Sequence, residues 1–121
     1  MKKIVIAMLV VFSVALVAFA ATSPEKVNLA EQWGLDTKKP AVEFPHAFHQ
    51  TKNECIECHM TAEGGALKSI KTGKEFNPKA LVASGDIKKG KTKNPAHDEF
   101  CWECHKAKKV PKGKSCSTCH K

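Results

Sequence analysis

The sequence has little from which to build a conventional hydrophobic core. It contains 121 residues with no tyrosine and no arginine, and the part from residue 21 onward has only six aromatic side chains: Trp33, Phe44, Phe48, Phe76, Phe100 and Trp102. A chain this short has room for one domain, and a chain this small and polar is marginally stable on side chains alone. We therefore expect bound groups to supply the missing apolar mass.

Cysteine is absent outside three short motifs, each with two cysteines three residues apart and a histidine directly after the second. The motifs use all six cysteines: Cys55-Ile56-Glu57-Cys58-His59, Cys101-Trp102-Glu103-Cys104-His105 and Cys116-Ser117-Thr118-Cys119-His120. Residues three apart lie on one face of a helical turn, so both thiols can bond to the two vinyl groups of one porphyrin. The histidine can then bind the iron. The pattern is typical of covalent c-type haem attachment, and three copies predict three covalently bound haems c.

The histidine count matches the number of axial positions on three irons. Three haems with two axial nitrogens each need six imidazoles, and the sequence has six histidines. Methionine is a poor alternative, because Met60 is the only methionine after residue 20 and it adjoins a motif histidine. We therefore predict bis-histidine ligation throughout. The proximal ligands would be His59, His105 and His120, and the distal ligands His46, His49 and His97.

The positions of the distal histidines restrict which iron each can reach. His97 lies eight residues before His105 on one predicted helix. It cannot reach the far side of the porphyrin held by that motif, so it should serve another haem. His46 and His49 are three residues apart and point the same way, so we expect them to bind two different haems. Such cross-links would hold the haems close together.

The first 20 residues are typical of a secretory signal peptide. Lys2 and Lys3 precede a long apolar run, and Ala18-Phe19-Ala20 is a small-residue cleavage site. We expect cleavage after Ala20 and a periplasmic protein. The alternative is an uncleaved anchor, although the 18 apolar-rich residues from 4 to 21 span roughly 27 Å as a helix, just short of the ~30 Å hydrocarbon layer. No cysteine near the cleavage site is available for lipid attachment.

Export raises the alternative that the six cysteines form three disulfides. That interpretation leaves the histidine after every second cysteine unexplained. Pairing cysteines three residues apart would also close only tiny loops, which restrict the unfolded chain little. Three Cys₂His₂ zinc sites are arithmetically possible, but adjacent cysteine and histidine suit them poorly. The sequence therefore favours haem over a zinc or disulfide-stapled module.

Glycine, proline and asparagine divide the chain into short elements. We predict a helical turn or two over 28–34, a strand over 42–44, and a helix that begins at Asn94-Pro95, runs through Cys104 and ends by Pro111. Asn53 and Ser115 are the expected N-caps of the first and third motif turns. Residues 60–95 are treated as a loop-rich insert packed around haem, with a turn or short strand near 80–84. The predicted fold class is small and mostly irregular, with short α-helices, a short N-terminal β-hairpin or strand, and a core formed by haems.

The chain resembles the class III cytochromes c, and most of all their triheme cytochrome c7 branch, which is related to tetraheme cytochrome c3. The resemblance rests on Val42-Glu43-Phe44-Pro45-His46, on His49 and His97, and on the three motifs. It covers residues 41–121 as one triheme domain, which leaves residues 21–40 as an N-terminal extension. It implies a c3/c7-like fold and the axial pairs His46–His59, His49–His105 and His97–His120. The insert over 60–95 is longer than the branch usually has.

Two imidazoles on each iron leave no open position for a substrate. We therefore predict an electron carrier rather than an enzyme, with low potentials because methionine ligation, which raises the potential, is absent. The resemblance implies electron transfer between redox partners in anaerobic respiration. The alternative is a haem enzyme or ligand sensor, which would need one histidine to be free and one iron to be five-coordinate.

The charge distribution suggests how partners are recognised. Residues 88–121 carry ten lysines against three acidic residues, around the second and third motifs. This surface either offsets the haem propionates or forms a docking face for an acidic partner near His120, with attraction that salt would weaken. The expected partners are periplasmic or membrane oxidoreductases and other multihaem cytochromes. With no arginine and no recognisable binding motif, we expect no nucleic-acid partner, and no stable membrane insertion after the leader is removed.

Overall fold

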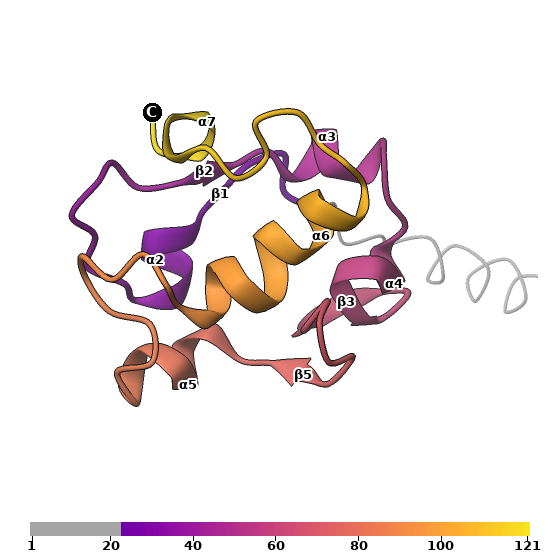
Figure 1. Cartoon of the computed structure of the whole chain (residues 1–121). Helices are drawn as coiled ribbons and strands as arrows, with labels where there is room; N and C mark the ends of the chain where they lie inside the picture. The colour runs from indigo at the N-terminus through magenta and orange to yellow at the C-terminus, as the bar shows by residue number, and fades with distance from the viewer. Residues whose placement is uncertain (1–22) are drawn as a thin grey trace, which may run out of the picture.

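The computed structural model describes residues 23–121 (Figure 1). The leader predicted over residues 1–20 lies outside the described residues. Within residues 23–121, no helix combines the length and the apolar character needed to cross a membrane. The chain is built from short helices and small strand pairs, as the sequence predicted.

The N-terminal part forms a two-stranded antiparallel ribbon with a helix between its strands. Strand β1 (Val27–Asn28) pairs with β2 (Glu43–Phe44), and α2 (Leu29–Trp33) follows β1 directly. The Asn28 side-chain oxygen accepts a hydrogen bond from the Glu31 N–H at 3.1 Å, which caps the helix start. Gly34 ends α2 in the left-handed region at φ 68°, where glycine is favoured. The expected helical turns over 28–34 and the N-terminal hairpin are confirmed.

The segment 60–95 contains more regular structure than expected. Strands β3 (His59–Thr61), β4 (Gly64–Lys68) and β5 (Glu75–Phe76) form an antiparallel sheet in the order β3-β4-β5. Helix α5 (Pro78–Ala83) follows, so the turn or strand expected near 80–84 was wrong. The reason is local: the Asn77 side-chain oxygen accepts from the Ala80 N–H at 3.1 Å, and proline is at the first helical position, where its missing N–H is harmless.

The longest helical stretch carries the second motif. Segment η1 (Ala96–Cys101) is π-helical and continues into α6 (Trp102–Ala107). The Asn94 side-chain oxygen accepts from the N–H groups of Ala96 and His97 at 2.9 and 3.2 Å. The helix predicted to start at Asn94-Pro95 and to run through Cys104 is therefore confirmed, although its first part follows i→i+5 geometry.

Three shorter helices carry two of the histidines and the other four cysteines: α3 (His46–Gln50), α4 (Cys55–Cys58) and α7 (Cys116–Cys119). The N-cap of α4 is Glu54, so the expected cap at Asn53 was wrong. Glu54 donates its N–H to the Glu57 carboxylate at 2.7 Å, while the Asn53 amide is used by the preceding helix and donates to the His49 carbonyl at 3.0 Å. Ser115 precedes α7 as expected, but its side chain makes no capping hydrogen bond.

A small apolar core lies between α2, β5 and α5. Its buried members are Trp33, Phe76, Ile87 and Ala96. The Trp33 and Phe76 rings meet edge to face at 6.4 Å, and Phe76 stacks on the ring of Phe100 at 5.3 Å. In Figure 1 β5 and α5 lie at the bottom of the view and α2 at its left, whereas α3 and α7 lie at the top and α4 at the right.

Candidate functional site

The structure brings the six histidines together in three pairs. The ring centres are 6.3 Å apart in the first two pairs and 6.4 Å apart in the third, and the interplanar angles are 81°, 26° and 79°. The pairs are His46 with His59, His49 with His105, and His97 with His120. Each pair joins one expected distal histidine to one motif histidine, and the partners are those that the family resemblance implied.

The separation within each pair fits one metal ion between two imidazoles. An imidazole nitrogen lies about 2.0–2.1 Å from a bound first-row metal. The nitrogen is about 1.1 Å from the ring centre, because the ring bonds are close to the C–N length of about 1.33 Å. The centres of two imidazole rings bound on opposite sides of one metal are therefore about 6.3 Å apart. The observed 6.3–6.4 Å leaves room for that metal and for little else.

Each of the six histidines donates its Nδ1–H to a backbone carbonyl. A carbonyl oxygen only accepts hydrogen bonds, so Nδ1 carries the proton. The lone pair of Nε2 is then available to bind a metal. Such hydrogen bonds orient a ligating ring and raise its basicity. The distances from Nδ1 to oxygen are 3.0, 3.0, 2.8, 2.5, 2.6 and 2.7 Å for His46 to Pro24, His49 to Pro45, His59 to Gly65, His97 to Thr92, His105 to Gly113 and His120 to Pro40.

Neighbouring residues pack closely on both rings of the His49–His105 pair. At Gly113, whose carbonyl accepts from His105, an added Cβ would lie 2.8 Å from the His105 Cβ and 2.9 Å from its Nδ1. Any other residue would therefore displace the imidazole or the loop. On the other side of the pair, the Phe44 ring lies 4.3 Å from the His49 ring. Neither contact could be predicted from the sequence, because both depend on how distant segments fold together.

The third pair shares a contact with the second motif. Trp102, between the two cysteines of that motif, stacks on the His97 ring at 4.6 Å with an interplanar angle of 14°. The Lys114 ammonium group lies 5.4 Å from the centre of the Trp102 ring, within range of a cation–π interaction. Because His97 faces His120, the attachment turn of one motif packs directly against a ligand position of another.

The six cysteines are all free thiols in the structure, on or beside α4, α6 and α7. Burial raises the pKa of the Cys101 thiol to about 12, with the neighbouring cysteines adding to the shift. Burial also raises the pKa of Cys58, Cys104 and Cys119. Redox-active and metal-binding thiols are instead activated by a lowered pKa. None of the four shifts is a lowering of this kind.

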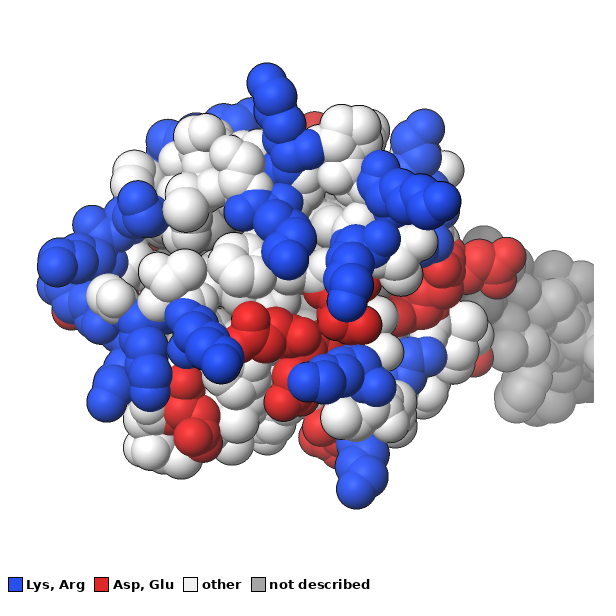
Figure 2. Space-filling model, viewed as in Figure 1, with Lys and Arg blue, Asp and Glu red and all other residues white. Residues whose placement is uncertain are grey.

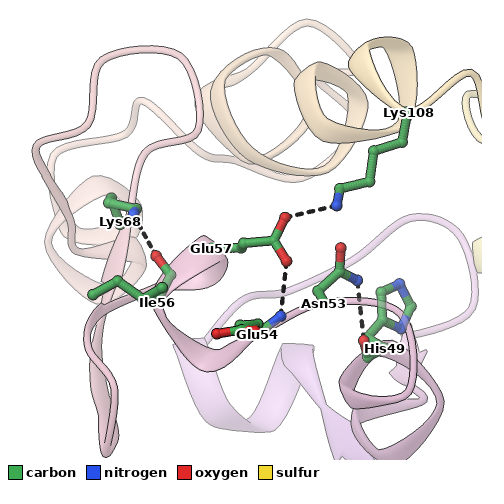
Figure 3. A network of polar contacts seen from close by, with 7 residues as sticks. All are labelled: His49, Asn53, Glu54, Ile56, Glu57, Lys68 and Lys108. Carbon is green, nitrogen blue, oxygen red and sulfur yellow. Dashed lines mark hydrogen bonds and ion pairs between the residues drawn. The ribbon is translucent and has the colours of Figure 1, made fainter.

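An ion pair joins the first and second motifs (Figure 3). The Lys108 ammonium at the end of α6 lies 2.6 Å from one carboxylate oxygen of Glu57, while the other oxygen accepts the Glu54 N–H. The hydrogen bond from Lys108 is the main cause that lowers the pKa of Glu57. Beside this pair, Lys68 on β4 donates to the Ile56 carbonyl. The polar network thus fixes α4 against both the sheet and α6.

The surface around these sites is rich in lysine. In Figure 2 lysines are spread over the upper and left parts of the visible face, and an acidic band crosses its middle. Four large apolar side chains are also exposed, namely Phe48, Ile56, Met60 and Val110. In residues 23–121, no group of three or more histidine, cysteine or acidic side chains is gathered as a metal site.

Comparison with known proteins identifies the family. The family model described as "Class III cytochrome C family" matches residues 19–121, which includes the segment over 21–40 that we treated as an extension. No curated protein and no solved structure matches the chain. Class III cytochromes are typically exported multihaem electron carriers with covalently bound haem c, and they exchange electrons with redox partners. The chain belongs to the class III cytochrome c family.

Proposed function

We propose that this protein is a periplasmic, low-potential triheme c-type cytochrome that carries electrons between redox partners in anaerobic respiration. The observation that carries the proposal is the set of three histidine pairs, each with ring centres 6.3–6.4 Å apart and every Nδ1 held by a carbonyl. The covalent attachment residues would be Cys55 and Cys58, Cys101 and Cys104, and Cys116 and Cys119. The axial ligands would be the paired histidines.

The chemistry that haem supplies is a one-electron iron couple. The chain contributes two nitrogen donors to each iron and so occupies both axial positions. An iron held between both imidazoles of a pair would have no free axial position for a substrate, which supports a carrier over an enzyme or a ligand sensor. Histidine in both positions, with no methionine, favours a low potential.

The lysine-rich surface supports recognition by charge. Residues 88–121 contain ten of the 20 lysines and only three acidic residues, and they include the second and third motifs. We propose that this region docks an acidic redox partner near His120. Long-range attraction of this kind speeds encounter and weakens as salt screens it. Electron exchange with an acidic partner should therefore slow as ionic strength rises.

The decisive experiment is to produce the chain in a host that matures c-type cytochromes and to measure mass and absorbance. We expect the mature mass to exceed that of the polypeptide by three haems, together with a Soret band. Carbon monoxide should bind poorly to the reduced protein, because no iron has a free axial position. A colourless product would refute the haem assignment, and rapid stoichiometric carbon monoxide binding would favour the five-coordinate alternative.

Electron paramagnetic resonance tests the histidine pairs individually. Perpendicular imidazole planes leave two iron d orbitals nearly equal in energy, whereas parallel planes separate them. The interplanar angles of 81°, 26° and 79° therefore predict two strongly anisotropic low-spin signals and one rhombic signal in the oxidised protein. Three equivalent signals would contradict the assigned pairs.

A further inference from the structure

The N-terminal arm, Ser23–Glu25, lies along helix α3. The Pro24 carbonyl accepts from the His46 Nδ1–H at 3.0 Å, and the carbonyl of the last arm residue accepts from the Ala47 N–H at 3.0 Å. The hydroxyl of the first arm residue pairs with the Gln50 amide through contacts of 3.0 and 3.2 Å. Three successive residues of the arm thus bind three residues of one short helix.

The arm contact differs from the one that orients the neighbouring histidine. His49 donates to the Pro45 carbonyl, four residues earlier in the same turn of chain, so its acceptor moves with α3. His46 donates to Pro24, which is 22 residues away in sequence. The arm residues are exposed, and hydrogen bonds of the three arm residues tie this segment to α3. The acceptor of His46 can therefore leave without unfolding α3.

The consequence follows from how such hydrogen bonds act. A carbonyl that accepts from Nδ1–H orients the ring and raises the basicity of Nε2, and loss of such a partner typically costs 10–100-fold in metal affinity. For His46, detachment of the arm would remove both effects. His59, on the opposite side of the same pair, keeps its own acceptor at Gly65. Only one of the two axial bonds would weaken.

We propose that the N-terminal arm is a detachable part of the first haem site, which controls how firmly His46 holds its iron. Docked, the arm keeps that iron closed to external ligands and lowers its potential. Released, it weakens His46, so that an external ligand can take its place and the potential rises. This inference rests on the proposed function, and it concerns one haem of the three.

The test is a complete chain from which residues 21–25 are deleted, so that Lys26 follows the expected cleavage site, with the start of the mature chain checked by mass. We expect three haems, and carbon monoxide affinity raised about 10–100-fold at one of them in the reduced protein. The reduction potential of that haem should also rise. The rise is 59 mV for each factor of ten by which the affinity of His46 for the oxidised iron falls more than its affinity for the reduced iron. The other two haems should be unchanged.

Two further variants make the result specific. Replacement of Ser23, Pro24 and Glu25 by three glycines keeps the carbonyls and the cleavage site but makes the arm flexible, and should give the same change with smaller size. Lys52→Ala alters an exposed position just after α3 that takes no part in the hydrogen bonds of the arm, and should bind carbon monoxide like the unaltered chain.

The outcomes separate this inference from the proposed function. Unchanged carbon monoxide binding and potential in both arm variants would overturn the inference, as would an equal change at all three haems. A change in Lys52→Ala as large as that in the deletion would also overturn it, because the effect would then not depend on the arm. Absence of three haems from the unaltered chain would instead refute the proposed function.

Discussion

The half of the molecule around α2, β5 and α5 and the half that carries the histidine pairs differ in what fills their interiors. In the first, Trp33, Phe76, Ile87 and Ala96 are buried against one another. In the second, helices α3, α4, α6 and α7 contain no buried residue at all. The large apolar side chains that are exposed within residues 23–121 also belong to this half: Phe48, Ile56, Met60 and Val110.

The difference shows where the polypeptide depends on its cofactors. The side-chain core lies mainly around α2, β5 and α5, and η1, which contributes Ala96 to it, joins it to the second motif. Where the motifs and histidines gather, apolar residues face outward, as they would against a bound porphyrin. We therefore expect the side-chain core to stay packed when one haem is lost. We also expect the histidine half to keep its three haems when the side-chain core is damaged.

The largest effect should come from removing one attachment site. In Cys101→Ser with Cys104→Ser, the haem count should fall from three to two, and amide hydrogens in α3 and α6 should exchange much faster because His49 and His105 lose the group between them. Mass spectrometry with hydrogen exchange measures both.

The matched control for that experiment is Ser117→Ala, at an exposed position between the cysteines of the third motif. It should keep three haems and the original exchange rates. If the amide hydrogens of α3 and α6 exchanged equally slowly with and without the second haem, the proposed division between the two halves would be contradicted.

A smaller and different effect is expected from Trp33→Ala. Trp33 is 7% exposed and packs on Phe76, so truncation should lower the free energy of unfolding by ~3–5 kcal/mol. The haem count should stay at three and the histidine pairs should keep their spectra. Denaturant titration of the holoprotein measures the change, with Lys79→Ala on the exposed surface of α5 as a near-neutral control. Loss of haem from Trp33→Ala would mean that the two halves are not separable.

The smallest effect should come from Glu57→Gln, which removes the ion pair with Lys108. Both side chains are exposed, so the loss of stability should be minor and should shrink in salt. Lys108 lowers the pKa of Glu57 below 4.5, so the pair stabilises the fold above pH 4.5 and this contribution is lost as pH falls through the lowered pKa.

Melting temperatures of the Glu57→Gln variant and the unaltered chain, compared across pH, should therefore converge in acid. A difference that persists at low pH would assign the effect to something other than charge. The haem count should not change, because neither residue is an attachment or ligand position in our proposal.

The sequence predicted the features that depend on residues close together in the chain. The motifs define which cysteines and histidines act together, and Asn28 with Gly34, like Asn94 with Pro95, marked real helix boundaries. The Asn77-Pro78 signal was of the same kind and should have predicted α5. The Asn53 prediction failed because a competing capping residue stood one position later.

What sequence could not predict is the set of carbonyl acceptors around the histidines. Every residue has a backbone carbonyl, so Pro24, Pro40 and Gly113 carry no compositional sign of this role. Strands of two residues, such as β1 and β5, are also too short to show an alternating pattern. Both features arise only when segments distant in sequence meet.

Helix α3 supplies one imidazole to each of two different histidine pairs, although it is only five residues long. A rod this short has no internal hinge, so a tilt or twist of it must shift both rings at the same moment. The two histidine pairs are therefore coupled through α3. A tilt of the helix that begins beside either of them reaches the other through its backbone, whereas loss of the acceptor of one ring, as on release of the arm, leaves the helix in place.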